Sequence, residues 1–198
     1  MSLLDLNNKE YVLNWETYFD YGIPGLGDKG LILNQDQSEI GGFLFTKNRL
    51  EGYSLSLFDK GGTIDVSNSK KNLSIVATRV GKWRRKIIRI TDNENKVLGF
   101  ARKKGIIDRK IFFTNSQDHE ILFSNPKEGT ILDLNDKTIA EYSLSQEKIK
   151  EGKGILKHIL IKRKYKLKIL DESFDRRVLL GFFSAILDHI LPNVVLLD

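Results

Sequence analysis

The sequence contains no cysteine and only three prolines among its 198 residues. Without cysteine, a disulfide scaffold, a thiolate metal site and a cysteine nucleophile are all excluded. A reducing compartment is compatible with that composition, and we expect a cytoplasmic protein. The first ten residues lack a basic stretch followed by a long apolar run, so we expect no secretory signal peptide.

Long apolar runs are also missing. The best candidate for a membrane span, Val178 to Leu197, is interrupted by Asp188, His189 and Pro192. Its uninterrupted part, Val178 to Leu187, is much shorter than the about 20 residues that a membrane-spanning helix needs. We therefore predict no transmembrane segment, and interpret this run as a buried helix.

Motifs for catalysis are absent as well. The sequence has no G-x-S-x-G, no HExxH and no glycine-rich phosphate loop before a helix. Its three histidines, His119, His158 and His189, are not arranged with other metal-ligand residues at helical or hairpin spacing, and Gly25 to Gly30 is interpreted as a loop. We expect no enzyme activity, no cofactor and no metal.

The charge balance is mildly basic, with 32 Lys and Arg against 26 Asp and Glu, and hydrophobic residues make up 40%. These proportions are typical of a folded globular chain, and the length suits one domain over residues 1–198. A net charge of +6 permits an acidic partner such as anionic lipid or nucleic acid.

Short alternating strands separated by polar turns occupy most of the chain. Four hairpins are predicted, with turns spaced about two dozen residues apart. They are 53–58 with 63–66, 87–91 with 97–101, 111–114 with 121–123, and 130–134 with 138–142. We expect Gly, Asn and Asp to form these turns, and Asp and Gly suit the first of them, 59–62, because they tolerate a positive φ. Strands are expected from about Gly30 to Ile169, closing into a barrel or sandwich that leaves no exposed sheet edge. Residues 1–29 remain open between helix and strand.

A C-terminal helix is predicted from a cap at Ser173 or Asp175 to Pro192, which we expect to end it. Arg177, Gly181, Ser184 and Asp188 fall on one narrow stripe, and almost everything else is apolar. A helix that is apolar nearly all round must be surrounded on most sides, so we place it inside the barrel. Its expected buried side chains are Leu179, Leu180, Phe182, Phe183, Ile186 and Leu187.

This combination resembles the tubby-like superfamily, and most closely its LURP-one-related and phospholipid-scramblase branches. The helix from Asp175 to Asp188 resembles that family most clearly, and the return strand Val97 to Phe100 with the repeated hairpins extends the likeness over about Gly30 to Asp198. The resemblance implies a twelve-stranded antiparallel barrel around a hydrophobic C-terminal helix. It also implies lipid headgroups as ligands. The scramblases' cysteine cluster and acidic calcium segment have no counterpart here beyond Asp171, Glu172 and Asp175.

A basic cluster is the strongest candidate site. Lys82, Arg84, Arg85 and Lys86 surround Trp83, and Arg102, Lys103 and Lys104 lie across the hairpin whose turn is 92–95. The two runs therefore meet at the open end of that hairpin, near Arg109 and Lys110 at the start of the next strand. Together they can hold phosphates, with Trp83 in a membrane interface or stacked on a base.

A second basic cluster is a ladder of four lysines, Lys162, Lys164, Lys166 and Lys168. If residues 159–170 form a strand, these lysines lie on its outer face at intervals of about 6.7 Å. That spacing resembles successive phosphates of a nucleic acid, although lysines also protect edge strands.

The leading hypothesis is a non-enzymatic barrel that binds anionic phospholipid headgroups, cytoplasmic and peripheral at a membrane. A nucleic-acid binder using the lysine ladder and a scaffold that binds a protein partner are the alternatives. Calcium-dependent lipid translocation near Asp171 to Asp175 is a third.

Overall fold

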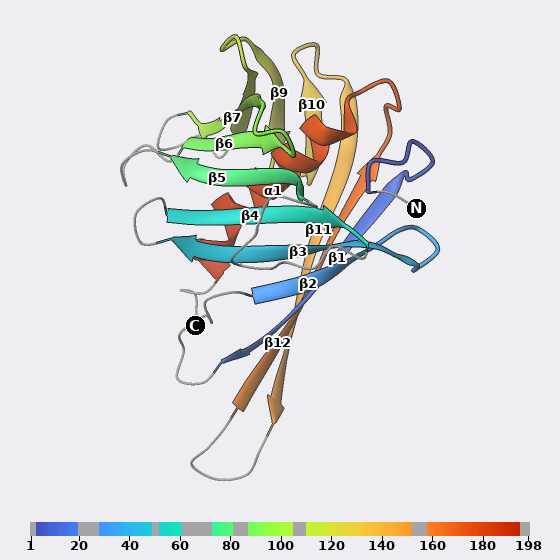
Figure 1. The fold of residues 1–198 in the computed structure, drawn as a ribbon, viewed down its shortest axis with the longest axis vertical. Helices are drawn as coiled ribbons and strands as arrows, with labels where there is room; N and C mark the ends of the chain where they lie inside the picture. Colours follow the sequence, from blue (N-terminus) through green and yellow to red (C-terminus); the bar gives the residue numbers. More distant parts are fainter. Residues whose placement is uncertain are drawn as a thin grey trace.

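The computed structural model describes residues 3–19, 28–48, 52–60, 73–80, 87–104, 110–151 and 158–194. Within these ranges, twelve strands precede one helix (Figure 1). The strands are β1 (Glu10–Phe19), β2 (Asp28–Leu33), β3 (Glu39–Asn48), β4 (Gly52–Asp59), β5 (Leu73–Val80), β6 (Ile87–Asp92), β7 (Val97–Lys103), β8 (Ile111–Asn115), β9 (Glu120–Asn125), β10 (Thr130–Asp133), β11 (Thr138–Glu151) and β12 (His158–Ile169). The helix is α1 (Arg176–Val194).

Each strand pairs with its neighbours in the chain in antiparallel register, and β1 pairs with β12 to close the barrel. The predicted fold class, a closed antiparallel barrel with a C-terminal helix, is confirmed. The stretch left open at the start of the chain forms β1, in which Tyr11 and Leu13 are buried. Closure leaves no free edge among these strands, as expected for a chain of consecutive hairpins.

Four hairpin turns share one hydrogen-bond pattern. In each, the side-chain oxygen of the first residue, Asn34, Asp92, Asn115 or Asp133, accepts from the amides two and four positions later at 2.8 to 3.0 Å. The fourth residue of each turn has a positive φ near 60°. Asn and Asp bond in this way to their own turn backbone, which explains why the sequence repeats them here. Because all four turns join an even-numbered strand to the next, they lie at the same end of the barrel.

One predicted hairpin is wrong. Strand 53–58 was expected to return along 63–66, but β4 pairs with β3 on one side and with β5 on the other. Residues 63–66 lie outside the described part of the chain. Residues 73–80 pair with β4 instead, because this run buries Ile75 and Ala77 on the inner face of the barrel.

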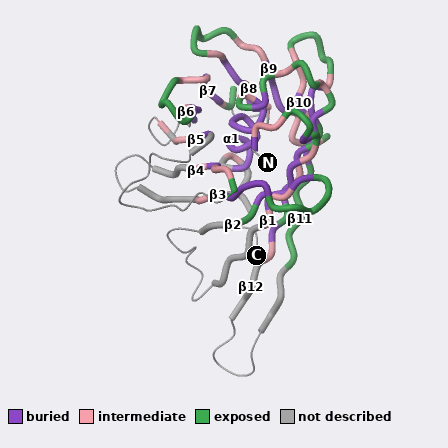
Figure 2. The backbone as a smooth tube through the Cα atoms, turned by 45° about the vertical axis from the view of Figure 1, so that its right-hand side comes forward, coloured by how far each residue is buried: buried purple, intermediate pink, exposed green. Residues whose placement is uncertain are grey.

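The core lies between the strands and α1 (Figure 2). Every residue of α1 from Leu179 to Leu187 is buried, including the six side chains predicted to be so. The Phe182 ring lies 5.6 Å from that of Phe113 in β8, and the Phe183 ring 6.0 Å from that of Tyr142 in β11. These are contacts that a helix inside the barrel would make, which is where the sequence predicts it.

Gly181 explains how α1 approaches the opposite wall. A Cβ atom there would lie 2.3 Å from Cγ2 of Ile90 in β6 and 3.3 Å from Cγ2 of Ile75 in β5. Glycine is therefore required for this close packing rather than for backbone freedom. Since β5 and β11 are six positions apart in the twelve-strand ring, α1 contacts opposite sides of it.

The start of the helix agrees with the prediction, and its end does not. Asp175 caps α1, its carboxylate accepting from the Arg177 amide at 2.8 Å. However, Pro192 does not end the helix, which continues to Val194. Proline removes a single N–H donor, so a helix can pass through it with local distortion.

Candidate functional site

Arg102 and Lys104 lie together on the outside of the barrel, at the end of β7. The Arg102 guanidinium is 3.6 Å from the Asp118 carboxylate and 3.8 Å from that of Glu120. The Lys104 ammonium also pairs with Glu120. Arg102 and Lys104 side chains are 37% and 48% exposed, so both cations remain accessible to solvent.

Two aromatic rings lie beneath the neighbouring lysines. Phe112 of β8 and Phe123 of β9 are 5.9 Å apart between ring centroids, tilted by 32°. The Lys104 ammonium sits 4.6 Å from the Phe112 centroid, and that of Lys110 sits 4.7 Å from the Phe123 centroid. A cation is attracted to the face of an aromatic ring at such distances. The rings therefore hold both ammonium groups at the surface of the sheet.

We call this surface the β7–β9 face. It consists of Arg102, Lys104, Lys110, Phe112, Asp118, Glu120 and Phe123. Lys103 is exposed beside it, at the last position of β7.

The other predicted members, Lys82, Trp83, Arg84, Arg85 and Lys86, lie outside the described residues. The strands on either side have the register that the prediction needs, because Ile87, the residue after Lys86, is the partner of Arg102. Four more cations therefore come in the sequence just before Ile87, the register partner of Arg102.

The lysine ladder has the predicted alternation. Arg163, Tyr165, Leu167 and Ile169 are buried, whereas Lys164 and Lys168 are exposed and Lys162 and Lys166 are half-buried. Carboxylates on the neighbouring strands β1 and β11, however, offset the positive charge of these lysines. Glu10 and Glu141 are the register partners of Lys168, and Glu16 and Glu147 those of Lys162. Lys166 forms an ion pair with Glu10 at 2.8 Å. The ladder is less basic than its sequence suggests.

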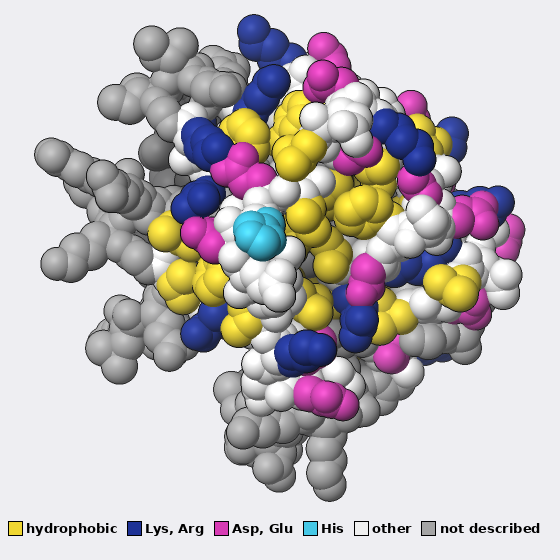
Figure 3. Space-filling model, turned by 90° about the horizontal axis from the view of Figure 1, so that it is seen from above, with side chains coloured by type: hydrophobic (Ala, Val, Ile, Leu, Met, Phe, Trp, Pro, Cys, Tyr) yellow, Lys and Arg dark blue, Asp and Glu magenta, His cyan; other side chains and the backbone are white. Residues whose placement is uncertain are grey.

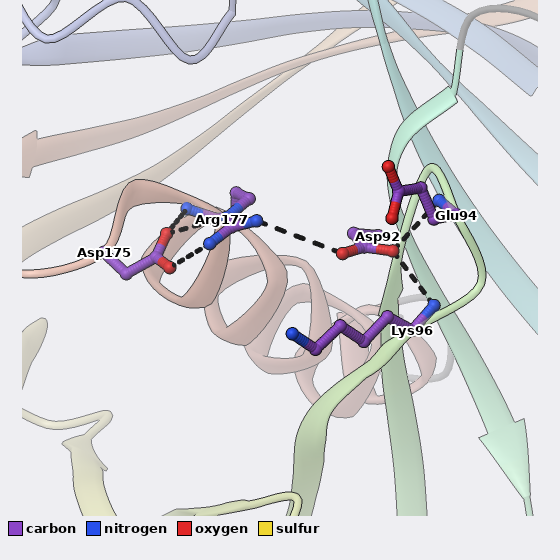
Figure 4. A network of polar contacts seen from close by, with 5 residues as sticks. All are labelled: Asp92, Glu94, Lys96, Asp175 and Arg177. Carbon is purple, nitrogen blue, oxygen red and sulfur yellow. Dashed lines mark hydrogen bonds and ion pairs between the residues drawn. The ribbon is translucent and has the colours of Figure 1, made fainter.

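The acidic residues before α1 are each engaged with a different cation. Asp171 pairs with Lys137 at 2.5 Å, Glu172 with Lys9 at 2.6 Å, and Asp175 with Arg177 at 2.7 Å. Arg177 also lies 4.0 Å from the buried carboxylate of Asp92, which ties the helix start to the β6–β7 turn (Figure 4). Within the part of the chain that the structure describes, no three His, Asp or Glu residues gather as metal ligands.

The Lys137 contact gives a pH-dependent prediction. The hydrogen bond from Lys137, with others from the Ser173 hydroxyl and amide, lowers the pKa of Asp171 to about 2. An Asp pKa lowered in the folded state stabilises the fold above the unfolded value, about pH 4, and that contribution is lost as the pH falls through 2. In Lys137→Met, NMR titration should find a higher Asp171 pKa, still held below normal by Ser173. An unchanged pKa would contradict the Lys137 contact.

Charge is distributed unevenly around the barrel. The turn end, defined as residues 3–9, 34–39, 59–60, 92–96, 115–120, 133–137 and 170–177, carries 13 Asp and Glu against 6 Lys and Arg. The whole chain has 26 and 32, so the remainder has 13 acidic and 26 basic residues. Viewed from above, acidic and basic side chains surround an apolar area (Figure 3). The turn end as defined therefore has an excess of carboxylates, which disfavours an anionic partner there.

No helix in the described ranges is both long and apolar enough to span a membrane. The histidines are dispersed: His119 is exposed in the β8–β9 turn, His158 begins β12 and His189 lies on α1.

Sequence reasoning missed four members of the β7–β9 face. Phe112 lies in an apolar run, Ile111 to Phe113, whose period does not show which residue points outward. Phe123 shares that ambiguity. Asp118 and Glu120 are distant in sequence from the cations they contact, and only the β7–β8–β9 register brings them together.

Comparison of the chain with protein-family models, with curated proteins and with solved structures finds no match.

Proposed function

We propose that this protein is a non-enzymatic barrel of the tubby-like class that binds anionic phospholipid headgroups at a membrane surface. The observation that carries the proposal is the β7–β9 face, where Arg102, Lys104 and Lys110 present exposed or half-exposed cations beside aromatic rings. The resemblance described above, with its hairpins and apolar helix, supports the same class.

Cations near an anionic bilayer each contribute about 1 kcal/mol to binding, and aromatic or long basic side chains suit the interface between water and lipid. The four cations around Trp83 directly precede β6, the strand that pairs with β7. They are therefore close in sequence to Ile87, the register partner of Arg102. The excess of carboxylates at the turn end disfavours binding through that end.

Nucleic acid remains the alternative ligand, but the carboxylates on both sides of the lysine ladder weigh against it. A protein-binding scaffold is the other alternative.

Vesicle co-sedimentation tests the proposal. At low salt, the full chain should bind phosphatidylcholine vesicles that contain phosphatidylserine, and not pure phosphatidylcholine. Neutralising the two lysines that lie over the rings, Lys104→Gln with Lys110→Gln, should lower the partition coefficient by about tenfold or more, since each cation is worth about 1 kcal/mol.

The matched control is Lys164→Gln with Lys168→Gln, which removes the same charge from the exposed face of β12. We expect less than about a threefold loss for it, because these two lysines lie on β12, away from the aromatic rings and cations of the β7–β9 face. Absence of binding by the unmodified chain, or equal losses for the two pairs, would overturn the proposal. Binding to single-stranded oligonucleotides that only the control pair weakens would favour the nucleic-acid alternative instead.

A further inference from the structure

The cations of the β7–β9 face are already in contact with carboxylates. Glu120 reaches both Arg102 and Lys104, and Asp118 approaches Arg102. Backbone structure fixes both acids: Glu120 begins β9 opposite Thr114, and Asp118 holds the positive-φ position of the β8–β9 turn.

We infer that Glu120 is a built-in competitor for the anionic ligand, so that this face binds a membrane only above a threshold of surface charge. The inference rests on the proposed function and concerns how the same site is regulated. Its basis is that Glu120 contacts both Arg102 and Lys104 and offsets their positive charge, so that a lipid phosphate or carboxylate gains less from these two cations.

Burial and exposure show why Glu120 rather than Asp118 is the main competitor. The Glu120 side chain is 25% exposed, whereas that of Asp118 is 73% exposed. A partly buried charge is screened less by salt than an exposed one, and Glu120 contacts two cations rather than one. Asp118 should therefore contribute in the same direction but less.

A weakly charged bilayer offers little to replace the Glu120 contacts, and it repels the carboxylate itself. A strongly charged bilayer attracts Arg102 and Lys104 enough to separate them from Glu120. Because exposed ion pairs are individually weak, the exchange lies within reach of an ordinary anionic leaflet. Binding should consequently rise steeply with the fraction of anionic lipid.

The test compares Glu120→Gln with the unmodified chain across vesicles of increasing phosphatidylserine fraction. At the lowest fraction that gives measurable binding, Glu120→Gln should raise the partition coefficient about fivefold, the value of one charge near an anionic surface. Its binding curve should shift to lower phosphatidylserine and become less steep. Asp118→Asn, which keeps a residue tolerant of positive φ, should show a smaller increase.

Glu128→Gln is the control, because Glu128 is exposed in the turn after β9 and its replacement changes the net charge equally. An equal gain for Glu120→Gln and Glu128→Gln would overturn the inference, since net charge alone would explain both. A loss of binding in Glu120→Gln would also overturn it, because Glu120 would then position Lys104 for the ligand. If the unmodified chain and all variants fail to bind, the proposed function itself fails.

Discussion

Replacing Phe182 by alanine is expected to lower the free energy of unfolding by about 4 kcal/mol, as measured by urea denaturation. Phe182 is fully buried, and its ring packs against Phe113 of β8 at 5.6 Å. Removing a buried phenylalanine costs about 3–5 kcal/mol, through lost apolar burial and the cavity left behind. This side chain belongs to the buried core that α1 shares with β8.

Phe183→Ala tests whether the barrel strands surround α1 on all sides. Its ring packs at 6.0 Å from Tyr142 of β11, on another part of the barrel wall. If α1 lies inside the barrel, Phe183→Ala should cost about as much as Phe182→Ala, because neither direction leads to solvent.

Leu134→Ala serves as the control, since Leu134 is 56% exposed in the β10–β11 turn and should change stability by less than about 0.5 kcal/mol. If α1 were packed on one side only, one of the two phenylalanine substitutions would lower the free energy of unfolding only slightly. A loss below about 1 kcal/mol for Phe183→Ala would therefore contradict the enclosed position.

Local chemistry is what made most of the fold predictable. The turns at 92–95 and 115–118 were found because Asp92 and Asn115 bond to the amides that follow them, an interaction contained within five residues. The alternation of β12 was found because period two persists over the whole strand. Where a strand's partner is distant, as for β4 and β5, adjacent turn signals gave the wrong pairing.

The candidate site was predictable only in part, for the same reason. A run such as Arg102 to Lys104 is visible in sequence, but its neighbours depend on register. Glu120 meets Lys104 because β7, β8 and β9 are paired, and no periodicity relates those two positions. Sequence thus indicated the cations and missed the carboxylates that regulate them in our proposal.

Arg176 begins α1 and is one of the few buried charged residues in the described part of the chain. Its side chain is only 3% exposed, and its guanidinium donates to the main-chain carbonyls of Leu6 and Asn8, each at 2.5 Å. The same N-terminal segment is anchored at its start, where the Leu3 amide donates to Asp59 at 2.5 Å. Arg176 therefore links the first turn of α1 to the segment that precedes β1.

Arg176→Met is accordingly expected to destabilise the protein by about 3 kcal/mol. Methionine fills similar space, but the buried carbonyl of Asn8 and the partly buried carbonyl of Leu6 lose their donor, and an unsatisfied buried acceptor costs about 1–3 kcal/mol. Removing the desolvation cost of the buried guanidinium offsets part of this, which keeps the estimate below the sum for two carbonyls. Hydrogen exchange should locate the effect, with faster exchange at the Asn8 amide, which bonds to Asp5 at 3.1 Å.

The adjacent Arg177→Met provides the matched control. It removes the same charge from the same helical turn, but Arg177 is 45% exposed and its partners are the carboxylates of Asp175 and Asp92. The exposed pair with Asp175 contributes about 0–1 kcal/mol, and the buried Asp92 keeps its hydrogen bonds from the Glu94 and Lys96 amides. This variant should therefore lose less than about 1 kcal/mol and leave exchange at Asn8 unchanged. Equal losses for the two variants would mean that charge at the helix start, rather than the buried bonds of Arg176, holds the N-terminal segment in place.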